Sequence, residues 1–136
     1  MSRKIVFTLC ALLVCFAASA QKERKTYYYA CLVTLNNDEA WVSPVKSVVL
    51  YERPNSRDRD IFDSRLLTQW REYIHAEVDR RFLTGNVVAF FVYGNTDEEW
   101  VTKEIRAATT RIRDRGIAII TTRYFNYVLS EEQKKP

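Results

Sequence analysis

The amino-acid sequence predicts a single small domain of the α/β class, or α+β, with elements in the order β-β-α-β-α-β. Three observations lead to this class. The stretch 86–128 has the pattern of a strand, a turn, a helix, a glycine and a second strand. An amphipathic helical stretch precedes it, and two short runs rich in aromatic and branched residues come earlier still. We therefore expect a four-stranded mixed sheet packed with two helices.

The first twenty of the 136 residues have the pattern of a secretory signal peptide. Arg3 and Lys4 precede an uncharged run over 5–18, which ends in small residues before Gln21. A run of about 14 residues is shorter than the roughly 20 that a membrane-spanning helix needs. Cleavage after Ala20 would release an exported protein without a membrane anchor, periplasmic in a bacterium and otherwise secreted.

Cleavage leaves a mature chain with little net charge and one cysteine. Without Arg3 and Lys4 the 21 basic residues become 19, against 17 acidic ones, so the net charge falls from +4 to +2. Acids and bases are interspersed, which argues against a nucleic-acid binder, since such proteins usually concentrate basic residues on one face. Cys31 lies in an apolar run and is interpreted as a small buried side chain. The alternative is a reactive or intermolecularly paired thiol.

The first part of the mature chain is predicted to form two strands. The charged lead 21–25 is expected to be disordered. In the strand predicted over 26–36, alternation places Tyr27 and Tyr29 on one face. The segments that follow are a loop or irregular edge over 39–46, which contains Trp41, and a second strand over 47–52.

An amphipathic helix is predicted over about 60–83. Asp60 or Asp63 could cap its start by accepting backbone N–H groups, and Gly85 follows its end. Its polar side carries His75, the only histidine in the sequence, which we expect to be solvated. Its apolar positions form one arc: Phe62, Leu66, Leu67, Trp70, Tyr73, Ile74 and Val78.

The strand predicted over 87–93 is apolar on both pleat faces. This pattern is typical of a strand covered on both sides in a parallel α/β sheet, so we expect it to be the central strand. Thr96 and Glu99 have the spacing of a capping box at the start of the second helix, and Gly116 is expected to end that helix. The buried stripe of this helix is predicted to comprise Val101, Ile105, Ala108 and Ile112.

The last predicted strand covers 117–128, so the folded domain is expected to span 26–129. The tail 130–136 is polar and expected to fray.

The predicted order of strands and helices leaves two arrangements of the helices open. Either one helix covers each face of the sheet, or both cover one face and the other face meets a partner, a second copy or the Trp41 loop.

No motif in the sequence identifies a reaction or a cofactor. It contains no G-x-G-x-x-G, no P-loop, no G-x-S-x-G, no H-E-x-x-H and no Cys-x-x-Cys. We therefore expect no cofactor and no metal site, and favour a non-enzymatic role over catalysis. The helix start after the loop 94–97 could offer N–H groups to an anion. The negative charges of Asp97, Glu98 and Glu99 at the same place would repel such an anion.

Two classes of function remain. The first is an exported, non-enzymatic envelope module that binds another protein, or itself as a homodimer, through an aromatic sheet surface or edge. The second is a small-ligand or glycan binder, or an enzyme, with a site near the Gly94–Asp97 loop or around Glu77 and Arg81. For the tyrosines, cross-strand pairing within the sheet is the competing interpretation. The candidate binding residues are Tyr27, Tyr29, Trp41, Glu77, Arg81, Asn95, Arg123, Tyr124 and Tyr127.

The strand-turn-helix-glycine-strand pattern of 86–128 resembles that of small periplasmic peptidoglycan-binding repeats of the SPOR type. The chain departs from that family at its amino end, because its first two predicted strands have no helix between them. The resemblance implies glycan binding, which is a sub-case of the second function.

Overall fold

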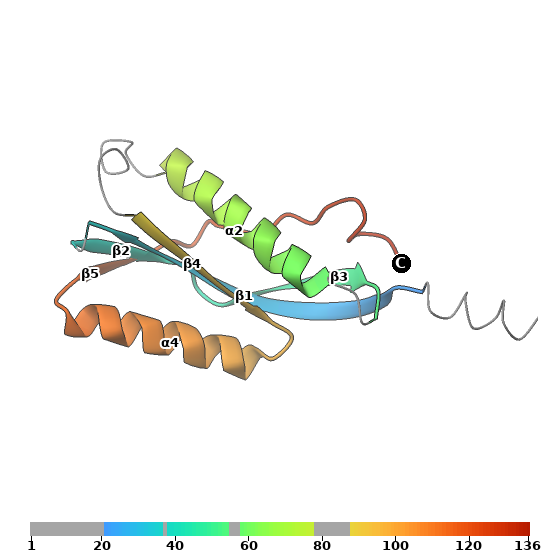
Figure 1. Cartoon of the computed structure of the whole chain (residues 1–136), viewed down its shortest axis with the longest axis horizontal. Helices are drawn as coiled ribbons and strands as arrows, with labels where there is room; N and C mark the ends of the chain where they lie inside the picture. The colour runs from blue at the N-terminus through green and yellow to red at the C-terminus, as the bar shows by residue number, and fades with distance from the viewer. Residues whose placement is uncertain (1–20, 37, 55–57, 78–87) are drawn as a thin grey trace, which may run out of the picture.

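The computed structural model describes residues 21–36, 38–54, 58–77 and 88–136. It confirms the predicted class, with two helices and one mixed sheet in these residues (Figure 1). The sheet has five strands rather than four, because the segment around Trp41 forms a short strand of its own. The elements in chain order are β1 (Glu23–Leu35), β2 (Glu39–Val42), β3 (Lys46–Glu52), α2 (Asp58–Glu77), β4 (Val88–Asn95), α4 (Glu98–Asp114) and β5 (Ala118–Thr121).

β1 is the central strand of the sheet. Along one side, its first half pairs antiparallel with β3 and its second half with β2. Along the other side, the residues from Tyr28 to Leu35 pair antiparallel with β4. β5 pairs in parallel with the outer side of β2. The sheet order is therefore β4-β1-β2-β5. β3 lies end to end with β2 along the same side of β1.

The position of β4 corrects the expectation that the strand at 87–93 is central. In the described part of the chain β4 pairs with β1 alone, so it lies at the edge of the sheet. Most of its side chains are half-buried. The strand with two covered faces is β1, in which every residue from Tyr27 to Leu35 is buried except Tyr28 and Thr34. β4 and β5 run in the same direction, but β1 and β2 lie between them.

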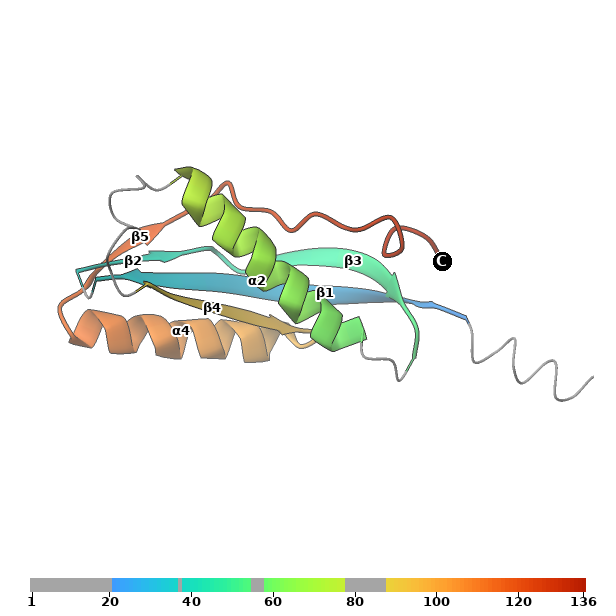
Figure 2. The ribbon, with the colours of Figure 1, turned by 45° about the horizontal axis from the view of Figure 1, so that its top comes forward.

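One helix covers each face of the sheet (Figures 1 and 2). The odd-numbered residues of β1 from Tyr27 to Leu35 face α2, and Ala30 and Leu32 face α4. Both predicted helix stripes are confirmed, except that Leu67 and Tyr73 are half-buried and Val78 lies outside the described residues. The buried stripe residues are Phe62, Leu66, Trp70 and Ile74 on α2, and Val101, Ile105, Ala108 and Ile112 on α4.

Both helices begin at other residues than predicted. α2 starts at Asp58, so Asp60 and Asp63 lie inside the helix and do not cap it. Its predicted end at 84–86 lies outside the described residues. α4 is capped by Asp97, and not by Thr96, because the Asp97 carboxylate accepts the backbone N–H groups of Glu99 and Trp100.

Gly116 ends α4 as predicted, with φ of +75°. The strand expected over 117–128 is regular only in β5. The C-terminal segment (122–134) then runs beside β3 and α2 without joining the sheet ladder (Figure 2). It leaves the sheet because Phe125 and Tyr127 insert into the core on the α2 side.

Two polar stretches that were expected to lack structure belong to the fold. In the lead 21–25, residues 23–25 are part of β1 and pair with β3. In the tail 130–136, Gln133 is buried and its carbonyl accepts the N–H of Tyr51 at 2.9 Å. The tail therefore covers the outer edge of β3 at that point.

Candidate functional site

Three of the four tyrosines predicted to form a binding surface lie in the core. Tyr27 and Tyr29 share one face of β1, as predicted, but α2 covers that face and each side chain is 2% exposed. The Phe62 ring stacks on Tyr27 at 4.6 Å between centroids and lies 4.7 Å from the ring of Tyr127. Tyr127 is buried as well. The prediction of a solvent-facing aromatic sheet surface is therefore wrong for these three residues.

Hydrogen bonds inside the core satisfy the polar ends of these tyrosines. The Tyr29 hydroxyl accepts the N–H of Tyr127 at 2.9 Å, and the Tyr127 hydroxyl donates to Gln133 at 2.9 Å. Burial raises the pKa of Tyr29 and of Tyr127, while these hydrogen bonds oppose the rise. Both phenols are therefore neutral, structural groups at physiological pH.

The other candidate residues that the structure describes do not gather into one site. Trp41 is half-buried against the α2-side core. Glu77 is exposed in the last described turn of α2, and Arg81 lies outside the described residues. Arg123 and Tyr124 are exposed on the C-terminal segment, Tyr124 at 86%.

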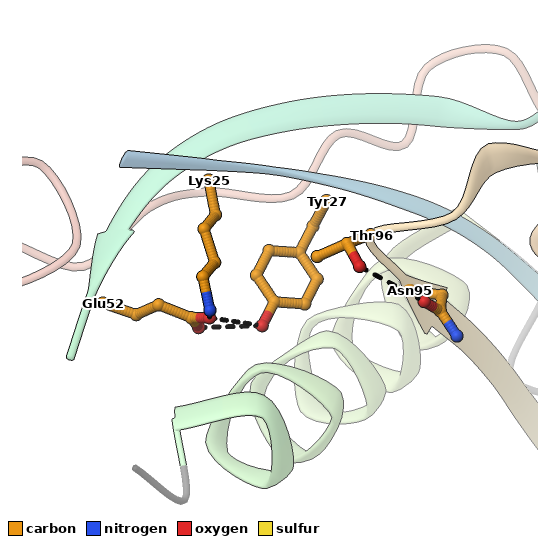
Figure 3. Close-up of polar contacts among 5 residues, drawn as sticks. All are labelled: Lys25, Tyr27, Glu52, Asn95 and Thr96. Carbon is orange, nitrogen blue, oxygen red and sulfur yellow. Dashed lines mark hydrogen bonds and ion pairs between the residues drawn. The ribbon is translucent and has the colours of Figure 1, made fainter. Parts of the chain in front are cut away.

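The loop 94–97 uses its polar groups to hold its own turn. The side-chain oxygen of Asn95 accepts the N–H of Asp97 at 3.1 Å and lies 3.5 Å from the Thr96 hydroxyl (Figure 3). Gly94 lies against α2, where an added Cβ would come 2.7 Å from a carboxylate oxygen of Asp63. These contacts explain the sequence of the loop as a tight connection between β4 and α4.

Sequence reasoning missed a buried polar cluster on the α2 side of β1 and β3. Glu52 is 5% exposed, and both of its carboxylate oxygens lie 2.8 Å from the Tyr27 hydroxyl (Figure 3). Lys25 approaches one of these oxygens at 2.9 Å. A cavity of about 550 Å³ opens beside Glu52, with Arg53 and Arg65 also in its wall. Alternation along β1 could have placed Lys25 and Tyr27 together, had residues 21–25 been read as strand.

The second missed feature is the outer edge of β4. Cys31, which lies opposite Val92, exchanges hydrogen bonds with Ser43 on the β2 side: its N–H donates to the Ser43 hydroxyl and its carbonyl accepts the Ser43 N–H. Because backbone groups alternate in direction along antiparallel strands, Val92 points its own N–H and C=O away from β1. The outward-pointing residues, spaced by two, are Val88, Phe90, Val92 and Gly94. We call this set the β4 edge.

In the described part of the chain, the β4 edge shows none of the features that usually protect an exposed strand. β4 is eight residues long and contains no charged residue and no proline. On its α4 side, Phe91 is 45% exposed. On its α2 side, the Arg71 guanidinium lies 5.4 Å from the centre of the Phe90 ring. His75 is exposed, as predicted, and its ring lies 6.2 Å from Phe90.

The opposite side of the sheet is protected. β5 is only four residues long. The C-terminal segment is tied along β2 and β3 by the Thr122 N–H, which donates to Val42, and by the Tyr51–Gln133 bond. Between these points Lys46 donates to the carbonyls of Arg123 and Phe125 at 2.8 and 2.6 Å. Within the described residues, the two sides of the sheet therefore differ in how far they are open to a further strand.

Within 21–36, 38–54, 58–77 and 88–136, no three His, Cys, Asp or Glu side chains are placed to hold a metal ion. None of the helices in the same ranges has the length and hydropathy needed to cross a bilayer.

No protein-family model matches the chain, and no significant similarity was found to a curated protein or to a solved structure.

Proposed function

We propose that the chain is an exported, non-enzymatic module that binds another protein, or a second copy of itself, by pairing a strand with the β4 edge. The observation that carries the proposal is the position of an uncharged eight-residue strand at the margin of the sheet. The outward N–H and C=O groups of the β4 edge have no hydrogen-bond partner among the described residues. Such an edge is a template for main-chain hydrogen bonds with an added strand.

The side chains around the β4 edge fit this mode of binding. Phe91 offers an exposed aromatic surface next to the outward backbone groups. Phe90 packs against the core on the α2 side, and the Arg71 guanidinium lies 5.4 Å from the centre of its ring. Strand addition draws affinity from main-chain bonds and specificity from alternate side chains, so it needs no deep cavity.

The location proposed for this module is outside the cytoplasm. The support is the charged, apolar and small-residue pattern of residues 1–20. The buried thiol of Cys31 is compatible with an oxidising compartment, because it is fully buried and its burial raises the thiol pKa. A thiol in that state is a poor substrate for oxidation or disulfide exchange.

The proposal is tested with the mature chain, residues 21–136, as bait in a pull-down from an envelope fraction. Val92→Pro removes an N–H that points away from β1, so the β1 ladder keeps its bonds. Val49→Pro is the matched control: the Tyr51 N–H donates away from β1, and alternation points the N–H of Val49 to the same outer edge of β3. Circular dichroism and thermal melting establish that both variants fold.

The expected result is that Val92→Pro loses the captured protein and Val49→Pro retains it. Capture that survives Val92→Pro at the wild-type level would place the binding surface elsewhere. Equal loss in both proline variants would also remove the support for the β4 edge, since only one of them alters it.

The second candidate function is binding of a small ligand or glycan, and the cavity beside Glu52 favours it. Its volume of about 550 Å³ is in the range of ligand pockets, and both signs of charge line it. A soluble peptidoglycan fragment that binds the wild-type chain and Val92→Pro equally, but not Arg65→Ala, would move the function to this cavity.

A further inference from the structure

We infer that the occupant of the β4 edge is β4 of a second copy of the chain, in an antiparallel pair whose two-fold axis passes beside Phe91. This inference rests on the proposed function and names the partner. A two-fold axis relates two copies through the same surface patch, so the patch must be complementary to itself. The β4 edge meets this condition in its backbone, its side chains and its charge.

The backbone of the β4 edge is symmetric about Phe91. The four outward-pointing residues lie in two pairs at equal distances before and after it. A two-fold axis beside Phe91 therefore places Val88 opposite Gly94 of the second copy, and Phe90 opposite Val92. In each of these pairs the two residues exchange N–H···O bonds in both directions. Every outward backbone group of the β4 edge gains a partner in this register.

The same register would also bury the exposed side chain of Phe91. This residue would face Phe91 of the second copy in a pair without hydrogen bonds, where Cα atoms approach to about 4.5 Å and side chains are closest. Phe91 is the one large apolar side chain of β4 that is exposed. Aromatic side chains directly opposite each other on neighbouring strands stabilise a sheet, so the two rings would cover each other.

Charge also favours pairing of β4 with itself. A two-fold axis sets each residue near it against an identical residue, so a charged side chain there would meet its own sign. β4 has no such side chain. On the α4 side, Tyr93 has one neighbour of each sign, Arg111 and Glu104.

On the α2 side, a row of residues spaced by four, Asp63, Leu67, Arg71 and His75, follows β4. Asp63 lies at the Gly94 end, and Arg71 and His75 lie at the Phe90 ring. The two-fold axis reverses this row in the second copy. The Arg71 end of one row then lies beside the Asp63 end of the other, which favours the antiparallel pair.

The register is tested by disulfide formation in the mature chain. Phe91→Cys places two thiols at the axis, where the Cα separation suits a disulfide, so mild oxidation should give a covalent dimer. Ala89→Cys is the matched control on the same face of β4. In this register its two thiols are four residues apart along the strands, about 13 Å, which is too far for a disulfide. The native Cys31 is buried and remains in both variants.

The dimer itself is tested by light scattering over a dilution series. The mature chain should have the mass of a dimer, and Phe91→Lys, which sets two ammonium groups together at the axis, should have the mass of a monomer. Val49→Lys changes a similarly exposed valine on β3 and should remain a dimer. Circular dichroism should be the same for all three proteins.

Each other result has a defined meaning. A dimer that survives Phe91→Lys, or one that crosslinks through Ala89→Cys and not Phe91→Cys, overturns the inference. A monomeric chain that captures an envelope protein, and loses it on Val92→Pro, also overturns the inference but leaves the proposed function standing. A monomeric chain whose capture does not respond to Val92→Pro contradicts both.

Discussion

The Tyr27 hydroxyl lies 2.8 Å from both carboxylate oxygens of Glu52, in the core between the sheet and α2. A buried carboxylate is stable only where donors replace the water it has lost. Here Tyr27 supplies one donor and the ammonium group of Lys25, at 2.9 Å, supplies another. The three side chains tie the first half of β1 to β3, the part of the sheet that α4 does not cover (Figure 2).

Tyr27→Phe tests how much the hydrogen bond between Tyr27 and Glu52 contributes to the free energy of unfolding. The variant keeps the ring that stacks on Phe62 at 4.6 Å, but it removes a donor from a buried carboxylate. We expect a loss of about 1–3 kcal/mol, measured by urea unfolding. Tyr28→Phe, on the other face of β1, is the control and should change stability by less than about 0.5 kcal/mol. Equal losses in the two variants would show that the contact with Glu52 contributes no more than a surface hydroxyl.

Replacing either of two glycines, Gly94 or Gly116, by alanine should lower the free energy of unfolding, for a different reason in each case. At Gly94 the added Cβ would lie 2.7 Å from an Asp63 oxygen and 2.9 Å from a ring carbon of Phe62, so α2 must shift. We expect Gly94→Ala to cost about 1–3 kcal/mol by overpacking. At Gly116 the Cβ meets no atom within 4 Å, but φ is +75°, so Gly116→Ala should cost about 1–2 kcal/mol through backbone strain alone.

Hydrogen exchange distinguishes the two causes. Gly94→Ala should speed exchange at amides of α2 and of the first half of β1, which pack together around Phe62. Gly116→Ala should speed exchange only near the end of α4. Faster exchange in α2 on Gly116→Ala would contradict the assignment of its cost to the local backbone.

The helical stripes could be predicted because helix periodicity is local. Val101, Ile105, Ala108 and Ile112 are spaced by three and four, and no other part of the chain is needed to recognise the buried side they form. Asp97 and Thr96 show where such reasoning stops: both can cap a helix, and the loop geometry decides between them.

The strand order could not be predicted from the same kind of pattern. β1 and β4 are both apolar on two faces, which identifies a covered strand but not which of two such strands is central. The difference is length. β1 has 13 residues, so its two halves can pair with β3 and β2 while β4 occupies its other side. Among the described residues, the open edge of β4 follows from that arrangement and has no signature within β4 itself.

The sequence places Tyr27, Tyr29 and Tyr127 at a binding surface rather than in the core for a related reason. Tyrosine has an apolar ring and a polar tip, so it suits a binding surface and equally a core that offers its hydroxyl a partner. The partners here are distant in the chain: Tyr27 is 25 positions from Glu52, and Tyr29 is 98 positions from Tyr127. No pattern within β1 could reveal them.

The stability of the protein should fall in alkaline solution, beginning with Cys31. Burial raises the pKa of Cys31 above its ordinary value of 9.0, and it raises the pKa of Tyr29 and Tyr127 above 10.0. A group with a raised folded pKa stabilises the protein fully below its unfolded pKa, and that contribution is lost as the pH rises toward the folded value. The free energy of unfolding should therefore be insensitive to these groups at neutral pH and decline above pH 9.

Urea unfolding at several pH values between 8 and 11 measures this decline. Cys31→Ala removes the group that ionises first in the unfolded chain, so its stability should fall less steeply between about pH 9 and 10 than that of the wild type. The comparison is of slopes, because the loss of the buried sulfur lowers stability at every pH. Identical slopes would contradict the burial-raised thiol pKa.

Lys46 is expected to hold the C-terminal segment against the outer side of β3. Its ammonium group donates to the carbonyls of Arg123 and Phe125 and, at 2.9 Å, to the side chain of Asn126. Lys46→Met keeps the stem and removes these charged hydrogen bonds, so we expect a loss of about 1.5–3 kcal/mol. Hydrogen exchange should become faster over 122–128 and remain unchanged in β4, which lies across the sheet.

Lys134→Met is the matched control for this variant. Lys134 also pairs with an acceptor at 2.9 Å, but its partner Glu131 is on the same exposed turn, so the change should cost less than about 1 kcal/mol. If Lys46→Met leaves exchange over 122–128 as slow as in the wild type, the insertion of Phe125 and Tyr127 into the core is sufficient to hold the segment. If exchange becomes faster in Lys46→Met, Lys46 is what keeps the C-terminal segment on the outer edge of β3 in the wild type. No residue that the structure describes covers the outer edge of β4 in a comparable way.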